Sequence, residues 1–241
     1  MADERLHVYS RGAVTEVEFD HPPINIYDVA TRDALCEVLT AVIADPDVRV
    51  VVFTATGEHY SAGADLAEFG TAPSLFAMRD ARWGRDVWGL LRSVPVPMIA
   101  SMQGNAVGFG FELALQCDLR IAADDCVVAL PEARVGMLPA GGASQTLPRL
   151  VGTSAALAAI VTGERVPVAD ALARGFVDEV VPRARLRSHT EGRAAAIAAR
   201  PTAVVRAAKA AVWAALDLPL DVGLRREADL AARARAASPR T

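Results

Sequence analysis

Short apolar runs, many of them rich in valine, isoleucine and alanine, recur along the first half of the chain between turn residues. Runs of this kind predict β-strands, which we place at residues 6–9, 14–19, 48–54, 98–102, 119–122 and 127–130. The Arg11-Gly12 turn between the first two runs predicts a hairpin. The third run is continuously apolar after Arg49, which is typical of a strand buried on both faces.

Helical periodicity first appears between the second and third predicted strands. Thr31 can cap a helix that runs to about Ala44, because apolar side chains recur on one face before Asp45-Pro46-Asp47 ends it. A second apolar helix is expected at about 110–116, and residues 70–82 are expected to be mobile or loosely helical. From Ser154 onward the chain is rich in alanine, and glycine and proline divide it into expected helices at 154–161, 168–174, 186–199, 202–215 and 220–237. The pattern therefore predicts an α/β core over residues 1–182 and a helical C-terminal region over residues 183–241.

Composition narrows the class of protein. Hydrophobic residues make up 52% of the 241 positions and charged residues 22%, which favours a globular protein of enzyme size over a disordered one. The formal net charge of −4 argues against a broad basic surface, so nucleic acid is not an expected partner. Three cysteines without CxxC spacing, Cys36, Cys117 and Cys126, are expected to be reduced core thiols in a cytoplasmic protein. We expect neither an export signal nor a membrane span.

Two turns rich in small residues are the first candidates for chemistry. Ser61-Ala62-Gly63-Ala64-Asp65 follows an expected strand, and the segment 104–112, Gly-Asn-Ala-Val-Gly-Phe-Gly-Phe-Glu, leads into an apolar helix. Small residues let the main chain approach a ligand closely, and free N–H groups at the starts of helices near Ala64 and Gly110 can point at it. Two such groups that converge on one oxygen would form an oxyanion hole. Alone, the first turn is equally well explained as a strand-to-helix connection.

Glu112 and Glu132 are the candidate acid and base. Each has an ordinary explanation, Glu112 as an acid in the first turn of a helix and Glu132 as an acid after Pro131. Glu112, however, lies in an apolar setting where a carboxylate is unusual. Beside a polarised carbonyl, the pair could add or move a proton. The four histidines show no ligand spacing, so a metal site is not expected.

Several blocks in a fixed order carry a resemblance to a known family. They are Pro22-Pro23-Ile24-Asn25, Val52-Phe53-Thr54-Ala55, the segment 61–66, the segment 104–113, the segment 117–122, Pro131-Glu132, the segment 147–152 and the segment 171–182. On these blocks the chain resembles the enoyl-CoA hydratase/isomerase, or crotonase, superfamily from about residue 6 to residue 235. The resemblance implies an α/β spiral of strand-strand-helix repeats, a helical trimerisation region, and substrates that are coenzyme A thioesters.

The resemblance also implies roles for individual residues. Ala64 and Phe109 match the main-chain oxyanion donors, and Glu112 and Glu132 match the two catalytic glutamates of the hydratases. The wall that faces coenzyme A would include Ala62, Ala64, Asp65 and Leu66, and Phe109 and Ala140 would also line the substrate site. The implied reaction is hydration of a 2-enoyl thioester in fatty acid metabolism, with no cofactor beyond the coenzyme A of the substrate and with a homotrimer or a dimer of trimers as the assembly.

Two other functions stay open. One is an enoyl-CoA isomerase or another crotonase-type acyl-CoA reaction. An isomerase needs one acid to move a proton between carbons, and Glu132 would be the residue retained. The other is a catalytically silent acyl-CoA-binding or assembly protein, which would keep only the fold. Both glutamates favour the hydratase. Three departures from the family pattern are Phe109 and Ala140, where glycine is common, and the end of the chain at Thr241, which is early for the family.

Overall fold

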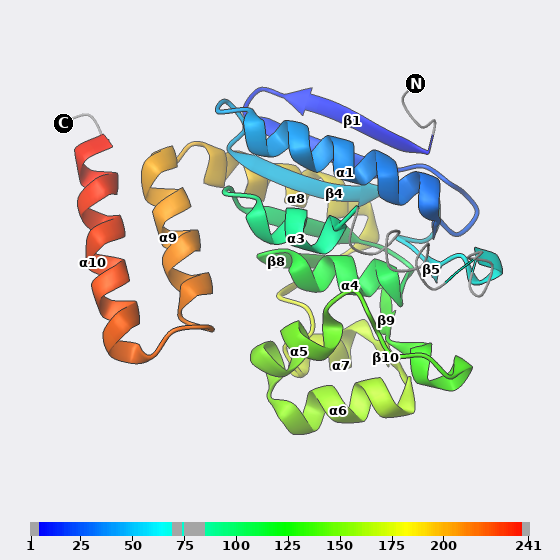
Figure 1. The fold of residues 1–241 in the computed structure, drawn as a ribbon. Helices are drawn as coiled ribbons and strands as arrows, with labels where there is room; N and C mark the ends of the chain where they lie inside the picture. The colour runs from blue at the N-terminus through cyan, green and yellow to red at the C-terminus, as the bar shows by residue number, and fades with distance from the viewer. Residues whose placement is uncertain (1–4, 69–73, 75–84, 238–241) are drawn as a thin grey trace.

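A six-stranded sheet forms the centre of the protein in the computed structural model, which describes residues 5–68, 74 and 85–237 (Figure 1). The strands lie in the order β1-β2-β4-β6-β8-β11. The first two form the predicted antiparallel hairpin, and every later neighbour in the sheet is parallel. Their bounds are β1 Leu6–Arg11, β2 Val14–Phe19, β4 Val50–Ala55, β6 Met98–Met102, β8 Leu119–Ala123 and β11 Glu179–Val181.

Two smaller sheets contain the two turns that the sequence indicated as candidate sites. Strands β7 Asn105–Val107, β9 Val127–Ala129 and β10 Arg165–Pro167 form one of them. Strands β3 Ile26–Tyr27 and β5 Gly63–Ala64 pair in parallel to form the other. Of these strands the sequence predicted β9 only, because elements of two or three residues are too short to show a hydrophobic period.

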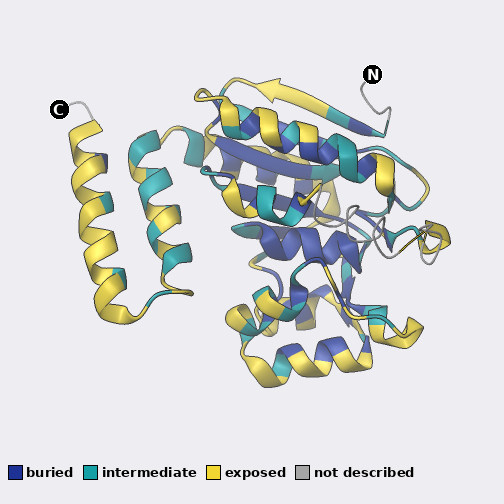
Figure 2. Cartoon of the chain, viewed as in Figure 1, coloured by how far each residue is buried: buried dark blue, intermediate teal, exposed yellow. Residues whose placement is uncertain are grey.

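Helices cover both faces of the central sheet (Figure 1). The larger hydrophobic core lies between the sheet and helices α1, α3 and α4, and a smaller core lies beneath α8. The first four residues of β4 are buried on both faces of the sheet, as predicted, and Val50, Val51 and Phe53 have no exposed surface (Figure 2). The helix bounds are α1 Val29–Ala44, α3 Val87–Ser93, α4 Phe109–Gln116, α5 Ala143–Val151, α6 Thr153–Thr162, α7 Val168–Ala173, α8 Arg183–Ala198, α9 Thr202–Ala214 and α10 Leu220–Ala237.

The cap of α1 differs from the sequence prediction. Asp28 is the N-cap, and its Oδ1 accepts hydrogen bonds from both the N–H and the hydroxyl of Thr31, each 2.8 Å long. Thr31 itself is buried in the first turn of the helix. Asp28 is the stronger cap because its carboxylate also carries the charge that the positive end of the helix favours. The prediction for residues 70–82 falls almost entirely outside the described part of the chain.

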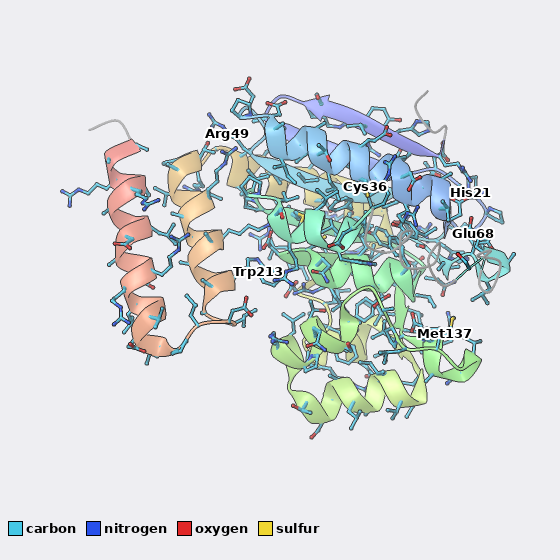
Figure 3. The ribbon with its side chains drawn as sticks, in the orientation of Figure 1. His21, Cys36, Arg49, Glu68, Met137 and Trp213 are labelled. Carbon is cyan, nitrogen blue, oxygen red and sulfur yellow. The ribbon has the colours of Figure 1, made fainter. Side chains whose placement is uncertain are left out.

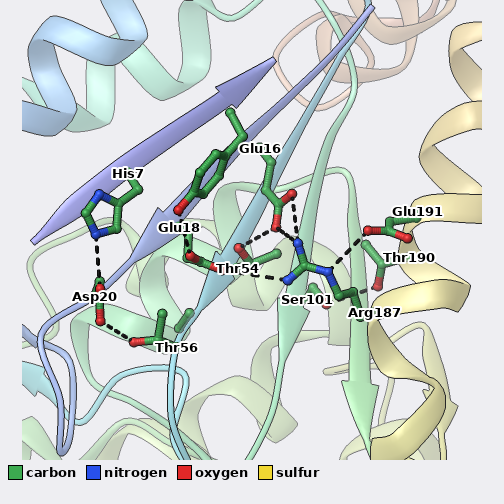
Figure 4. Close-up of polar contacts among 12 residues, drawn as sticks. His7, Glu16, Glu18, Asp20, Thr54, Thr56, Ser101, Arg187, Thr190 and Glu191 are labelled. Carbon is green, nitrogen blue, oxygen red and sulfur yellow. Dashed lines mark hydrogen bonds and ion pairs between the residues drawn. The ribbon is translucent and has the colours of Figure 1, made fainter. Parts of the chain in front are cut away.

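Helix α8 is joined to the sheet by a polar network around Glu16 of β2 (Figure 4). Glu16 is 4% exposed, and its carboxylate accepts hydrogen bonds from Arg11 Nε at 2.7 Å, Thr54 Oγ1 at 3.2 Å and Arg187 Nη2 at 3.2 Å. Arg187 lies on α8, and its Nε also donates to Glu191 one turn later. The network therefore joins the N-terminal hairpin, β4 and α8.

The C-terminal pair α9 and α10 extends to one side of the core (Figure 1). Its contact with the core centres on Asp118, which accepts hydrogen bonds from Lys209 Nζ at 2.8 Å and from Trp213 Nε1 at 2.7 Å (Figure 3). Lys209 also donates to the carbonyl of Val96. The predicted α/β fold with a helical C-terminal region is confirmed, whereas the boundary at residue 183 stays a prediction. Within the described residues, no helix is both long and apolar enough to cross a membrane.

Candidate functional site

The first predicted turn is held in place by its serine. Ser61 Oγ donates to the carbonyl of Asn25 at 2.8 Å and accepts the N–H of Gly63 at 3.1 Å. The main chain of Ser61 also bonds Asn105 and Val107 of β7, so the two predicted turns lie against each other. The hydroxyl of Ser61 therefore stabilises the turn.

Ala64 does not begin a helix, which corrects the sequence expectation. It ends the short strand β5, and a 3₁₀ turn follows at Leu66–Glu68. The N–H of Asp65 donates to the carbonyl of Tyr27 on β3 at 2.9 Å. Because successive N–H groups of an extended chain point in opposite directions, the N–H of Ala64 points away from β3. The strand geometry thus directs this N–H group without any help from a helix dipole.

The second turn opens α4, with Gly108 as its N-cap. The first N–H groups of a helix have no partner within the helix, and Phe109 supplies the first of them. Gly63 and Gly108 bring the two turns together: a Cβ added at Gly63 would lie 3.1 Å from Val107 O and 3.7 Å from Phe109 N. Both glycines have positive φ angles, +105° and +54°, which other residues rarely adopt. The geometry therefore places the main chain of Ala64 close to the start of α4.

Glu112 lies one turn into α4 and is 5% exposed. Its Oε1 accepts the N–H of Gly141 at 2.7 Å and the N–H of Ala143 at 3.2 Å, both at the start of α5. These bonds fix the carboxylate and leave Oε2 turned toward Gly141, where an added Cβ would lie 2.7 Å from it. The two donors are main-chain N–H groups, so a substitution of the side chain at either donor residue would not remove the group that orients the carboxylate.

Glu132 lies in a 3₁₀ turn at Pro131–Val135, beside the second glycine turn. A Cβ added at Gly108 would lie 2.9 Å from Glu132 Oε1, which sets this acid next to the N–H of Phe109. Its other oxygen, Oε2, is buried and has no hydrogen-bond partner among the described residues. Burial raises the pKa of Glu132 above its ordinary value. A buried carboxyl oxygen without a partner and with a raised pKa is typical of a functional acid.

The remaining predicted residues lie around the first turn and at α5. The N–H of Ala62 bonds the carbonyl of Ile24, and Asp65 Oδ1 accepts the N–H of Ala67. Leu66 is 59% exposed and Ala140 is also exposed. Glu68, at the end of the 3₁₀ turn, accepts the N–H of Val29 and so ties this turn to α1 (Figure 3). Ala62, Asp65 and Leu66 thus form a rim at the first turn, which these hydrogen bonds hold in place. Ala140 directly precedes Gly141, whose N–H bonds Glu112.

Sequence reasoning did not identify three groups at this site. Gly141 and Ala143 hold Glu112, although attention fell on Ala140. Trp88 of α3 is partly buried and lies against Gly141, where an added Cβ would be 2.2 Å from its Cζ2. Tyr27 stacks on Phe109. No signal near either aromatic in the sequence indicates these contacts, which form between segments distant in the chain.

Two other features of the described residues do not belong to this site. A cavity of about 440 Å³ lies between α8 and strands β2, β4 and β6, but neither glutamate lines it, and its Glu16 and Arg187 already pair with each other. No group of three or more histidine, cysteine, aspartate or glutamate residues in the described ranges could hold a metal ion. The groups that the two turns bring together are main-chain N–H groups and the carboxyl groups of Glu112 and Glu132.

A sequence model of the enoyl-CoA hydratase/isomerase family matches residues 10–238. The chain belongs to this family. Among curated relatives, it is 39% identical over 179 residues to the putative enoyl-CoA hydratase/isomerase YngF of Bacillus subtilis, and the match covers 74% of the chain and 69% of YngF. It is also 37% identical over 171 residues to the peroxisomal bifunctional enzyme of Danio rerio, which covers 70% of the chain but only 23% of that enzyme.

Solved structures of the family share the fold over almost the whole chain. The enoyl-CoA hydratase of Bacillus anthracis is 31% identical, with a TM-score of 0.91, and the match covers 98% of this chain and 92% of that one. The crotonase fold expected from the sequence is thereby confirmed. Membership of this family supports the assignment of the protein as a crotonase-type enzyme that acts on an acyl-CoA.

Proposed function

We propose that this protein is an enoyl-CoA hydratase, which adds water across the 2,3 double bond of an acyl-CoA thioester. The observation that carries the proposal is Glu132 Oε2, buried without a partner beside the N-terminus of α4, together with a second buried carboxylate, Glu112, fixed by main-chain N–H groups. An acid with an unused oxygen and a separately held carboxylate are what a water addition needs.

The thioester carbonyl binds between the N–H groups of Ala64 and Phe109. As the reaction proceeds, negative charge moves onto this oxygen, and two fixed donors stabilise it more in the transition state than in the ground state. Loss of one such donor in other enzymes costs about 2.7–4 kcal/mol. The rim of Ala62, Asp65 and Leu66 supports the coenzyme A portion.

Proton transfer is divided between the two glutamates. Glu112 takes a proton from water as its oxygen bonds to the β-carbon, and the electrons of the double bond move onto the thioester oxygen. Glu132 then gives its proton to the α-carbon as the carbonyl re-forms. The raised pKa of Glu132 favours the protonated form that this step requires. Proton exchange with solvent restores both groups, and no step calls for a metal or a further cofactor.

Crotonyl-CoA is the test substrate, because hydration removes the absorbance of its conjugated double bond. Glu132→Gln should lower turnover by about 10²- to 10⁴-fold, since the amide keeps the shape but carries no transferable proton. Thioester binding should change only a few-fold. Wild-type activity in the variant would remove Glu132 from the mechanism.

The isomerase alternative is separated by Glu112→Gln. Only the water reaction needs the second carboxylate, so this variant should lose hydration and keep any migration of the double bond on a 3-enoyl-CoA. Equal losses of the two reactions would contradict this division of roles. A chain that binds the thioester and leaves both substrates unchanged would instead be the silent acyl-CoA-binding protein.

A further inference from the structure

Three aromatic rings adjoin the candidate site, and they define what we call the aromatic cluster: Tyr27 of β3, Trp88 of α3 and Phe109 of α4. The rings of Tyr27 and Phe109 are face to face, with centroids 3.2 Å apart and planes within 12°. Trp88 lies on Phe109 at 5.3 Å and 55°. Phe109 is 6% exposed. Its ring therefore has a packed neighbour at its face and another at its side.

The cluster reaches the catalytic carboxylate through Trp88. The point where a Cβ on Gly141 would stand is 2.2 Å from Trp88 Cζ2, 2.4 Å from Trp88 Cη2 and 2.7 Å from Glu112 Oε2. The outer edge of the indole and Oε2 of Glu112 therefore border the same small volume. Only a glycine fits between them.

The order of groups along the substrate places this edge on the acyl side. With the thioester oxygen at Ala64 and Phe109, the α-carbon faces Glu132 and the β-carbon faces Glu112. The part of the acyl group beyond the β-carbon must then continue past Glu112, where Trp88 stands. The ring of Phe109 packs against Trp88, so it belongs to the same wall.

Packed rings do not move aside at low cost. To admit a longer chain, Phe109 would have to leave its contact with Tyr27, and Trp88 would have to leave the core residues that support it. Protein interiors are close-packed, and forcing extra methylene groups into them costs energy. One methylene that does not fit a hydrophobic pocket changes discrimination by about 10- to 200-fold.

We propose that Trp88 and Phe109, with Tyr27 as support, restrict the acyl group to short enoyl chains, so that four carbons are preferred over eight. This inference rests on the proposed hydratase function and adds the substrate class. In this proposal the cluster sets the length limit because the indole edge borders the space next to Glu112 Oε2.

The experiment measures chain-length preference in two ways. Hydration kcat/KM is measured for 2-enoyl-CoA thioesters of four, six, eight and ten carbons, and binding of saturated butyryl-CoA and octanoyl-CoA is measured by calorimetry. Wild type should prefer four carbons over eight by at least about tenfold in both measurements. Trp88→Phe, which removes the ring edge next to Glu112, should reduce that preference by at least about tenfold, and Phe109→Ala should do the same.

Tyr9→Ala is the matched control, because it removes an exposed aromatic ring from β1, away from the cluster. It should keep the wild-type preference. Equal use of four- and eight-carbon substrates by wild type would overturn the inference, as would an unchanged ratio in folded Trp88→Phe. Should Phe109→Ala fail to fold, Trp88→Phe still decides the matter.

The binding arm separates this inference from the proposed function. Suppose that no substrate is hydrated, but that butyryl-CoA binds tenfold more tightly than octanoyl-CoA and that Trp88→Phe abolishes this difference. That result would support the length limit and reject the hydratase function. Hydration without a length preference would do the reverse. No binding of either thioester would overturn both.

Discussion

The role proposed for Glu132 as an acid opposes the stability of the folded protein. Its raised pKa means that ionisation costs more in the folded than in the unfolded chain. Its protonated form therefore supports folding fully below the ordinary pKa of 4.5, and this support is lost as the pH rises through the raised value. At pH 8 we expect Glu132→Gln to have a higher Tm than wild type, and the difference should disappear near pH 4.

Calorimetric melting at the two pH values measures this effect. Glu37→Gln, which changes a 75% exposed acid on α1, should leave Tm almost unchanged at both. A lower Tm for Glu132→Gln at pH 8 would show that the carboxylate is stabilised rather than strained. The same ionisation predicts that kcat/KM falls about tenfold per pH unit above the raised pKa of Glu132.

Residue positions were predictable where the chain carries its own signal. Glu112 stands out as a charge within an apolar helix, and Gly108 as a small residue before one. The direction of the Ala64 N–H was not predictable, because it depends on pairing with Tyr27, 37 positions earlier. Trp88 acquires its place from Gly141 in the same way. Contacts between distant segments leave no local pattern to read.

At the scale of elements, we expect the ion pairs of the buried Glu16 carboxylate to contribute to the free energy with which α8 packs on the sheet. Its two arginine partners are about half exposed and can return to water, whereas Glu16 cannot. Replacing both, Arg11→Met with Arg187→Met, leaves a buried charge without a cation and should lower the free energy of unfolding by about 3–5 kcal/mol. Urea unfolding measures this loss.

Adding Glu16→Gln to the double arginine variant should recover most of the stability, since the buried charge is then gone. No recovery would show that the arginine stems contribute through packing instead. The cavity beside the network leaves room for water, so the single variant Glu16→Gln should cost less than the double arginine change.

Element prediction succeeded for the long strands of the central sheet and for the alanine-rich helices. It failed for α3 and α5, which have seven and nine residues, and for β3, β5, β7 and β10. Such elements are set by their neighbours rather than by propensity. The two turns of the candidate site are built from these short elements, so their geometry was less predictable from the sequence than their position along the chain.

At the scale of the whole molecule, most of α9 and α10 is exposed or only partly buried (Figure 2), and apolar side chains of both helices face solvent. The most exposed are Val212 at 69%, Leu220 at 78% and Leu224 at 55%. No described residue of α9 is buried, and Ala234 alone is buried in the described part of α10. We predict that this surface is covered in a trimer or a dimer of trimers.

Light scattering at micromolar concentration measures the assembly. Val212→Glu should shift it toward monomer, because a charge would be buried at the contact. Val8→Glu, at a 47% exposed position on β1, should leave it unchanged. A monomeric wild type would contradict the prediction.

The docking of α9 has a chemical consequence, because Lys209 is the only lysine in the sequence. Its side chain is 10% exposed and is held by Asp118 and the carbonyl of Val96. This side chain is thus the single lysine target for amine-acylating reagents and for enzymes that acetylate or ubiquitinate lysine. Its amine is inaccessible while α9 stays docked on the core. Modification of Lys209 would therefore show that α9 had separated from the core, and the reactivity of this one amine measures how often the undocked state forms.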